Sequence, residues 1–208
     1  MIKSAVGERL DGLIHRLFPF LFWGRLNPNT LTVCGSLVSV VAAIAFGEGW
    51  LRTGGVLVLA GGFFDLVDGV VARHHGTSSR FGGFLDSTLD RLVDLALLVG
   101  LSVHFARLGR PELVLLAGVT ATACALVSYS KARAELGGAR IEVGILERGE
   151  RIGLLAAGAI LGWLVPVLLI VAIGSIITVA QRFAAAYREF EKLEESRSAG
   201  EESGGCPR

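Results

Sequence analysis

Long apolar stretches alternate with short polar connections along this chain. Five apolar runs of helical length occupy residues 29–47, 52–73, 82–107, 111–136 and 152–180. Most of them approach the roughly 20 residues that a helix needs to cross a bilayer. The last run is too long for one untilted span and is interrupted by Gly162 and Pro166. We therefore expect it to form a short fifth span, a tight turn and a sixth span, which predicts an all-α polytopic membrane protein with six transmembrane helices.

The two ends of the chain differ from these apolar runs. Residues 2–24 place apolar side chains near one helical face, with most charged side chains elsewhere. This pattern is typical of an amphipathic helix in the membrane interface. The tail is rich in Ser, Gly and Glu, and we expect it to be disordered. The predicted organisation is an interfacial amphipathic helix over 1–26, a six-helix transmembrane domain over 27–190, and a disordered polar tail over 191–208.

Composition and charge agree with a membrane protein. Of the 208 residues, 52% are hydrophobic and 19% are charged, which is too apolar for a soluble domain of this size. The net charge of +1 gives no indication of nucleic-acid binding. Basic residues gather in the first 28 residues, in 73–91, in 131–151 and from Arg182 onward. The positive-inside rule places these regions, and both termini, on the cytoplasmic side of the cell inner membrane.

Five aspartates interrupt the second and third apolar runs, namely Asp65, Asp68, Asp86, Asp90 and Asp94. The first two are three residues apart and the next two are four apart, so each pair shares one helical face. Two neighbouring antiparallel spans would aim these four carboxylates at one place, where they would repel one another. A divalent cation removes the repulsion, and oxygen ligands favour Mg²⁺ or Mn²⁺. We therefore expect a metal site at Asp65, Asp68, Asp86 and Asp90.

Two other interpretations of the aspartates stay open at this point. The carboxylates could be paired between spans with Arg73, Arg80 or Arg91. They could also mark the path of a small ion transporter, because intramembrane carboxylates often do. Asp94 lies one turn beyond Asp90, and we expect it to form a hydrogen bond or an interhelical pair instead of ligating metal directly.

The aspartates belong to a longer pattern, Asp65-x2-Asp68-Gly69-x2-Ala72-Arg73-x8-Gly82-x3-Asp86-x3-Asp90. This pattern resembles the signature of the CDP-alcohol phosphotransferase family, with every fixed position filled. The resemblance implies an enzyme that uses divalent metal to transfer a phosphatidyl group from CDP-diacylglycerol to an alcohol, releasing CMP. It implies Asp90 as the catalytic base, completing the metal site. It also implies a CDP site formed by Asn29, Thr32, Asp65, Asp68, Gly69, Ala72, Arg73 and Gly82. A catalytically inactive relative would not be expected to keep the whole signature.

Cations at three helix ends bear on the identity of the acceptor. They lie on the side where the aspartates open, which suggests a pocket for a phosphorylated polyol, although anchoring to lipid head groups would use the same residues. The segments "SYSKARAE", "ERGER" and "QR" resemble those of bacterial phosphatidylinositol-phosphate synthases within the family. The resemblance implies myo-inositol phosphate as acceptor, contacted by Ser128, Lys131, Arg133, Arg148, Arg151 and Arg182.

Several features of the reaction and the assembly stay open. A phosphatidylglycerophosphate synthase that uses glycerol 3-phosphate is the alternative acceptor assignment, and an archaeal diether lipid would fit the donor motif equally well. Family members form homodimers, so a homodimer is expected. Small-residue pairs such as Gly54–Gly55 and Ala156–Ala157 permit close helix contact, but they do not identify the interface.

Overall fold

The structure is a computed structural model that describes the backbone of residues 27–75 and 79–203 and the side chains of residues 27–72 and 79–195. The interfacial helix expected over 1–26 lies outside these residues. Within the described part every regular element is a helix. In chain order the helices are α2 (Pro28–Gly47), α3 (Leu51–His75), α4 (Arg80–Arg107), α5 (Pro111–Leu136), α6 (Arg148–Leu161) and α7 (Leu164–Ser203).

Local polar groups fix where the helices begin. The Asn27 side chain accepts a hydrogen bond from the Asn29 amide at 3.0 Å, and Pro28 occupies the first turn of α2, where its missing N–H costs nothing. The Ser79 hydroxyl caps α4 by accepting from the Gly82 amide at 2.9 Å. These caps set the helix ends that carry the candidate nucleotide residues.

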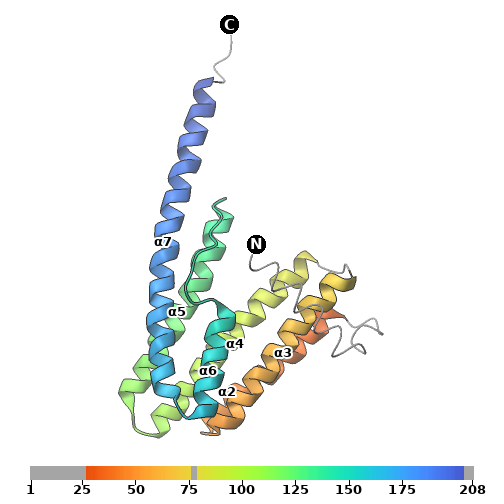
Figure 1. The fold of residues 1–208 in the computed structure, drawn as a ribbon, viewed down its shortest axis with the longest axis vertical. Helices are drawn as coiled ribbons and strands as arrows, with labels where there is room; N and C mark the ends of the chain where they lie inside the picture. The colour runs from red at the N-terminus through yellow and green to blue at the C-terminus, as the bar shows by residue number, and fades with distance from the viewer. Residues whose placement is uncertain (1–26, 76–78, 204–208) are drawn as a thin grey trace.

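The helices form a bundle with two dissimilar ends (Figure 1). Three tight turns, α2–α3, α4–α5 and α6–α7, lie at one end, and α7 extends past the other helices at the opposite end. In the α2–α3 turn, Glu48 forms a 2.9 Å ion pair with Arg107. This arginine holds the pKa of the Glu48 carboxyl below its ordinary value. The aspartates of α3 and α4 lie toward the end opposite these turns, where the bundle opens.

Within the described residues, four helical segments are long and apolar enough to cross a membrane, namely Pro28–Gly47, Leu51–Ala72, Pro111–Leu136 and Leu164–Glu195. Apolar side chains such as Leu37, Ile44, Leu115 and Ile170 are exposed on the outside of the bundle, as a lipid-facing surface requires. The protein is therefore a multi-pass helical membrane protein. The helix boundaries agree closely with the apolar runs, and α5 matches its expected range of 111–136.

Glycines bring the helices into close contact. A Cβ atom at Gly100 of α4 would lie 2.1 Å from the Ala43 carbonyl oxygen of α2, and one at Gly55 of α3 would lie 2.8 Å from the Ala156 carbonyl oxygen of α6. Only glycine permits these backbone approaches. Gly55 and Ala156, considered above for close helix contact, thus pack together within one chain.

The C-terminal segment differs from the expectation. A disordered tail was predicted over 191–208, but α7 continues as a helix to Ser203. The physical reason is that Glu, Lys, Leu, Arg and Ala, which are strong helix formers, dominate this stretch. An ion pair of 2.7 Å between Lys192 and Glu189 adds support at i,i+3 spacing.

Candidate active site

Three of the predicted carboxylates converge. Asp65 and Asp68 from α3 and Asp86 from α4 each offer an oxygen, and these oxygens lie within 4.8 Å of one another. Asp68 is only 7% exposed. Its Oδ2 atom is buried and has no hydrogen-bond partner within the described residues. An unsatisfied buried carboxylate oxygen is costly, which indicates that this group has a partner that the chain does not supply.

Close packing of α2 against α3 holds the cluster in place. A Cβ atom at Gly35 would lie 2.7 Å from the Phe64 Cβ, directly before Asp65, and one at Gly61 would lie 2.1 Å from the Ser39 hydroxyl. This contact brings Thr32 of α2 beside Asp68. Of the four carboxylates expected to converge, Asp65, Asp68 and Asp86 come together in the described chain, and Asp90 lies outside this group.

The donor set fits a divalent cation. Three carboxylates on two helices provide hard oxygen ligands of the kind that Mg²⁺ and Mn²⁺ prefer. The unpartnered Oδ2 of Asp68 is the atom that a cation would satisfy. Asp90 lies one helical turn beyond Asp86 and outside this group of three.

Arg148, at the start of α6, links the aspartates. Its guanidinium lies 3.0 Å from Asp65, 2.9 Å from Asp90 and 3.5 Å from Asp94. Interhelical Asp–Arg pairing therefore exists alongside the carboxylate cluster, with α6 as its source. Arg91, one of the partners considered from the sequence, donates instead to the Ser87 carbonyl.

A buried ion pair lies directly behind Arg148. Arg151 is only 2% exposed, and its guanidinium reaches Asp94 at 3.1 Å and the Leu146 carbonyl at 3.3 Å. The interhelical pair predicted for Asp94 is confirmed. Asp94 thus contacts two arginines of α6 and joins α4 to α6 at the site.

A polar cavity of about 380 Å³ opens beside Asp90, between α4, α5, α6 and α7. It brings together five of the six residues expected to bind acceptor phosphate, namely Ser128, Lys131, Arg148, Arg151 and Arg182. Arg182 is held by bonds to the carbonyls of Val143, at 3.0 Å, and Val127. Among the described residues, the ion-pair partner of Lys131 is Glu135, at a long 3.9 Å, so its ammonium group is the least committed of the cations that line the cavity.

Arg133 is the exception among these six residues. It does not line the polar cavity but a different pocket, between α5 and α7. The reason is its helical position: two residues after Lys131, it points to another side of α5. Its expected role in binding acceptor phosphate is not supported by this placement.

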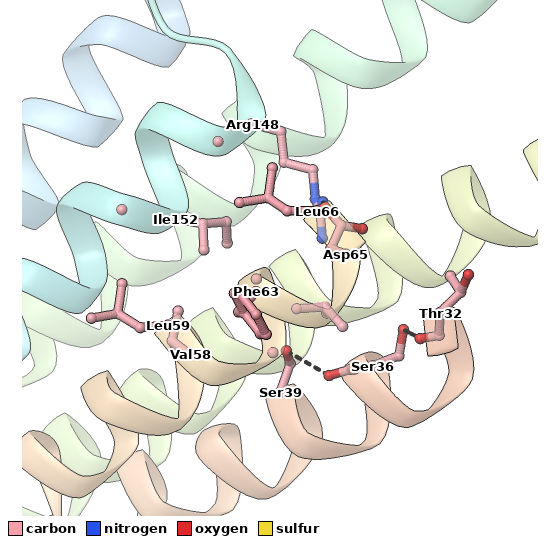
Figure 2. Close-up of a pocket in the computed structure, with 16 residues that line it drawn as sticks. Thr32, Ser36, Ser39, Val58, Leu59, Phe63, Asp65, Leu66, Arg148 and Ile152 are labelled. Atoms are coloured by element: carbon pink, nitrogen blue, oxygen red, sulfur yellow. Dashed lines mark hydrogen bonds and ion pairs between the residues drawn. The ribbon is translucent and has the colours of Figure 1, made fainter. Parts of the chain in front are cut away.

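A second cavity of about 400 Å³, the apolar groove, lies between α2, α3 and α6 (Figure 2). Asp65 and the guanidinium of Arg148 face each other at one end, and Val58, Leu59 and Ile152 continue the groove away from them. Side chains at Gly62, Gly149 and Gly153 would meet nothing within 4 Å. This groove was not predicted from the sequence, although the glycines in "AGGFF" and "RGERIG" indicate positions where side chains leave space.

The remaining nucleotide candidates lie near the carboxylates. A Cβ atom at Gly82 would come within 3.1 Å of the Asn29 side-chain oxygen, so the N-terminal ends of α2 and α4 meet there. Gly69 and Ala72 are half-buried on α3 beyond Asp68. Arg73 belongs to α3, but its side chain lies outside the described residues.

Comparison with known proteins identifies relatives that cover most of the chain. The family model for CDP-alcohol phosphatidyltransferase matches residues 25–187. A phosphatidylinositol phosphate synthase of Mycobacteroides abscessus is 40% identical over 169 residues, covering 76% of each chain. An archaetidylinositol phosphate synthase of Methanothermobacter thermautotrophicus is 42% identical over 141 residues, covering 67% of this chain and 69% of its own.

Solved structures agree with these relatives. The phosphatidylinositol phosphate synthase of Mycobacterium tuberculosis with CDP-DAG bound superposes with a TM-score of 0.74 at 30% identity, covering 88% of this chain and 94% of that chain. The same enzyme in complex with manganese and citrate superposes with a TM-score of 0.73 at 31% identity, covering 87% and 88% of the two chains. A manganese-bound neighbour agrees with the fit of the carboxylate cluster to a divalent cation.

Proposed function

Because the chain belongs to the CDP-alcohol phosphatidyltransferase family, we propose that it transfers a phosphatidyl group from CDP-diacylglycerol to myo-inositol phosphate and releases CMP. One observation carries this proposal. The apolar groove and the polar cavity meet at Arg148, with Asp65 on the groove side and Asp90 on the cavity side. A lipid donor and a charged acceptor therefore have separate approaches to one set of carboxylates.

The apolar groove suits the lipid donor. Its walls of Val58, Leu59 and Ile152 can take acyl chain, while its polar end lies beside the aspartates, where the diphosphate belongs. The residues proposed to contact CDP are Asn29, Thr32, Asp65, Asp68, Gly69, Ala72, Arg73 and Gly82. The relatives include enzymes named for both phosphatidyl and archaetidyl products, and the groove's apolar lining fits an acyl or an ether chain.

The carboxylates have two roles in this proposal. Asp65, Asp68 and Asp86 hold a divalent cation, Mg²⁺ or Mn²⁺, and Asp90 completes the site. When bound, the metal neutralises the diphosphate and stabilises the departing CMP. Asp90 also faces the polar cavity, where the acceptor hydroxyl would lie, and this position supports it as the general base.

Each bond that forms or breaks in the proposed transfer, and the proton that moves, can be assigned. The acceptor hydroxyl oxygen attacks the β-phosphorus of CDP-diacylglycerol and forms a new P–O bond. The bond between that phosphorus and the bridging oxygen breaks, and CMP leaves with the electron pair. The hydroxyl proton passes to the Asp90 carboxylate. Arg148 contacts both Asp65 and Asp90 at about 3 Å, so it can fix the position of the donor side of the site relative to the acceptor side.

The cations of the polar cavity favour an acceptor that carries its own phosphate. Lys131 and Arg182 lie apart from the carboxylate cluster, at the α5 and α7 sides of the cavity. A free alcohol would leave the Lys131 ammonium with its long 3.9 Å contact to Glu135, whereas a phosphorylated polyol would offer it a closer anion. Inositol phosphate is preferred to glycerol 3-phosphate because the similar relatives are named for inositol phosphate products.

The membrane arrangement completes the proposal. We place α2 to α7 as six spans forming a catalytic domain over 27–190, with residues 1–26 as a helix in the interface. The site and both termini face the cytoplasm at the cell inner membrane, supported by the basic residues at the open end of the bundle. A homodimer is proposed from family membership.

Acceptor kinetics test the proposal. Purified protein in detergent is given CDP-diacylglycerol with Mg²⁺ or Mn²⁺, and CMP release is measured with inositol phosphate, glycerol 3-phosphate or free inositol. We expect EDTA-sensitive release that is fastest with inositol phosphate. Preference for glycerol 3-phosphate would reject the acceptor and keep the family chemistry, whereas release with none of the three would reject the proposal.

A substitution at Lys131 tests whether the acceptor binds in the polar cavity. Lys131→Ala should raise the acceptor KM about tenfold or more, because it removes one charge-assisted hydrogen bond. The donor KM should not change. Lys192→Ala is the matched control, since Lys192 is an exposed lysine paired with Glu189 on α7 and does not line the cavity. An equal rise in both KM values would assign Lys131 a general structural role.

A further inference from the structure

A third cavity of about 480 Å³, the α5–α7 pocket, lies between the C-terminal half of α5 and the middle of α7. Its lining is largely aromatic and aliphatic, and includes Leu126, Tyr129, Phe183, Tyr187 and Phe190. It shares no residue with the apolar groove. Of the residues used in the proposed reaction, the pocket includes only Arg182, which also lines the polar cavity.

The charged groups of the α5–α7 pocket are all positive. Arg133 and Arg182 line it, and none of the lining residues is acidic. Arg133 is exposed, and its guanidinium has no ion-pair or hydrogen-bond partner within the described chain. The polar cavity differs, because Asp90, Asp94 and other acids line it together with its cations. Arg182 is held by two backbone carbonyls, and the lining residue Tyr187 contacts Glu191, so Arg133 is the cation of the α5–α7 pocket that can meet an anion.

The composition of the pocket is also typical of a site at the membrane interface. Its residues come from the last turns of α5 and the middle of α7. Figure 1 shows that α7 continues outward past this end of α5. Tyr129 and Tyr187 are 62% and 66% exposed, and such amphipathic rings concentrate where the bilayer meets water. Phe183 is equally exposed and presents an apolar surface beside Arg133. A ligand there would meet cations and aromatic carbon together.

We propose that the α5–α7 pocket binds an anionic phospholipid at a site distinct from the donor groove. The head-group phosphate would meet the free guanidinium of Arg133, and the acyl chains would lie against Leu126 and Phe183. A free phosphate compound would leave the aromatic lining unused, and a zwitterionic lipid would bring a second, repelled positive charge to the arginines. Arg182 lines this pocket and the polar cavity, so the lipid would lie directly behind the acceptor site.

Photolabelling of the full chain tests this site. The protein is placed in phosphatidylcholine nanodiscs that contain a minor fraction of phosphatidylglycerol with a diazirine near its head group. After irradiation, labelled peptides are mapped by mass spectrometry. We expect labelling in 126–137 of α5 and in 182–190 of α7. Labelling confined to peptides of α2, α3 and α6 would place the lipid in the donor groove and overturn the proposal.

Substitutions distinguish binding in the pocket from a general electrostatic attraction of the lipid to the protein. Arg133→Gln should lower labelling of the α5 and α7 peptides about tenfold, as expected for one lost charge-assisted bond. Phe183→Ala should also lower it, without unfolding the protein, because this side chain is exposed. Arg188→Gln is the matched control: it removes the same charge from α7, but Arg188 lines a different cavity, so labelling should persist.

Competition identifies the occupant. Unlabelled phosphatidylglycerol should displace the probe, whereas added phosphatidylcholine and inorganic phosphate should not. Equal displacement by phosphatidylcholine would reject selection for charge, and displacement by inorganic phosphate would make the site one for a free anion. Unchanged labelling in both Arg133→Gln and Phe183→Ala would likewise overturn the proposal.

Discussion

Replacing Asp94 by Asn should destabilise the protein through Arg151. The side chain of Arg151 is 2% exposed, and Asp94 at 3.1 Å is its acidic partner. The amide of Asn is close in size to the carboxyl group but carries no charge. Arg148 keeps its contacts with Asp65 and Asp90 after the change. The loss of counter-charge therefore falls mainly on Arg151.

The expected size of the effect follows from burial. Removing one partner of a buried ion pair costs about 3–5 kcal/mol, because the other charge stays buried without compensation. Replacing both partners by apolar residues of similar volume is often close to neutral. The double variant Asp94→Leu/Arg151→Met should therefore be much more stable than the sum of the two single variants implies. The site would still be damaged, since Arg148 would lose one of its three acidic contacts.

The assay is equilibrium unfolding in mixed micelles, followed by circular dichroism, for the wild type, the two single variants and the double variant. Glu48→Gln is the control, because Glu48 forms an exposed ion pair with Arg107, and surface pairs contribute little. A loss below about 1 kcal/mol for Asp94→Asn, or additivity in the Asp94/Arg151 cycle, would refute the buried pair as the element that joins α4 to α6.

Two further predictions concern the carboxylates and the packing of the helices. Asp86→Asn should weaken Mn²⁺ binding, measured by electron paramagnetic resonance without substrates, at least about tenfold, because one of three converging oxygen ligands is lost; unchanged binding would place the metal elsewhere. Gly100→Ala should cost about 1–3 kcal/mol of unfolding free energy, because its Cβ would lie 2.1 Å from a carbonyl oxygen of α2. Gly118→Ala, which meets nothing within 4 Å, should cost nothing, and equal losses would contradict the close contact.

Local sequence patterns predicted much of the fold and the metal site. Apolar runs and caps such as Asn27 and Ser79 act within one or two helical turns, so helix boundaries follow from neighbouring residues. The spacing of Asp65 and Asp68, and of Asp86 and Asp90, fixes a shared face on each helix. Because α3 and α4 are sequential and antiparallel, shared faces were enough to predict that the carboxylates converge.

Contacts between distant helices were harder to predict. The ion pairs of Arg148 with Asp65 and Asp90 depend on how α6 lies against α3 and α4, and no spacing in the sequence encodes that distance. Arg133 is a different case, because its spacing of two residues from Lys131 already places it on another side of α5. The positions of α6 and α7 decide which cavity each side of α5 faces. The C-terminal end of α7 was not predicted because its Ser, Gly and Glu content is typical of a disordered tail, although its Glu, Lys, Leu, Arg and Ala residues favour a helix.

The most direct test follows the β-phosphorus of the donor. CDP-diacylglycerol labelled at that phosphorus is incubated with the protein, inositol phosphate and Mn²⁺, and the lipid and aqueous products are separated. We expect the label to appear in phosphatidylinositol phosphate and unlabelled CMP to be released in equal amount, and we expect both products to depend on acceptor and metal. Label in phosphatidate at a rate independent of the acceptor, or turnover that persists in EDTA, would contradict it.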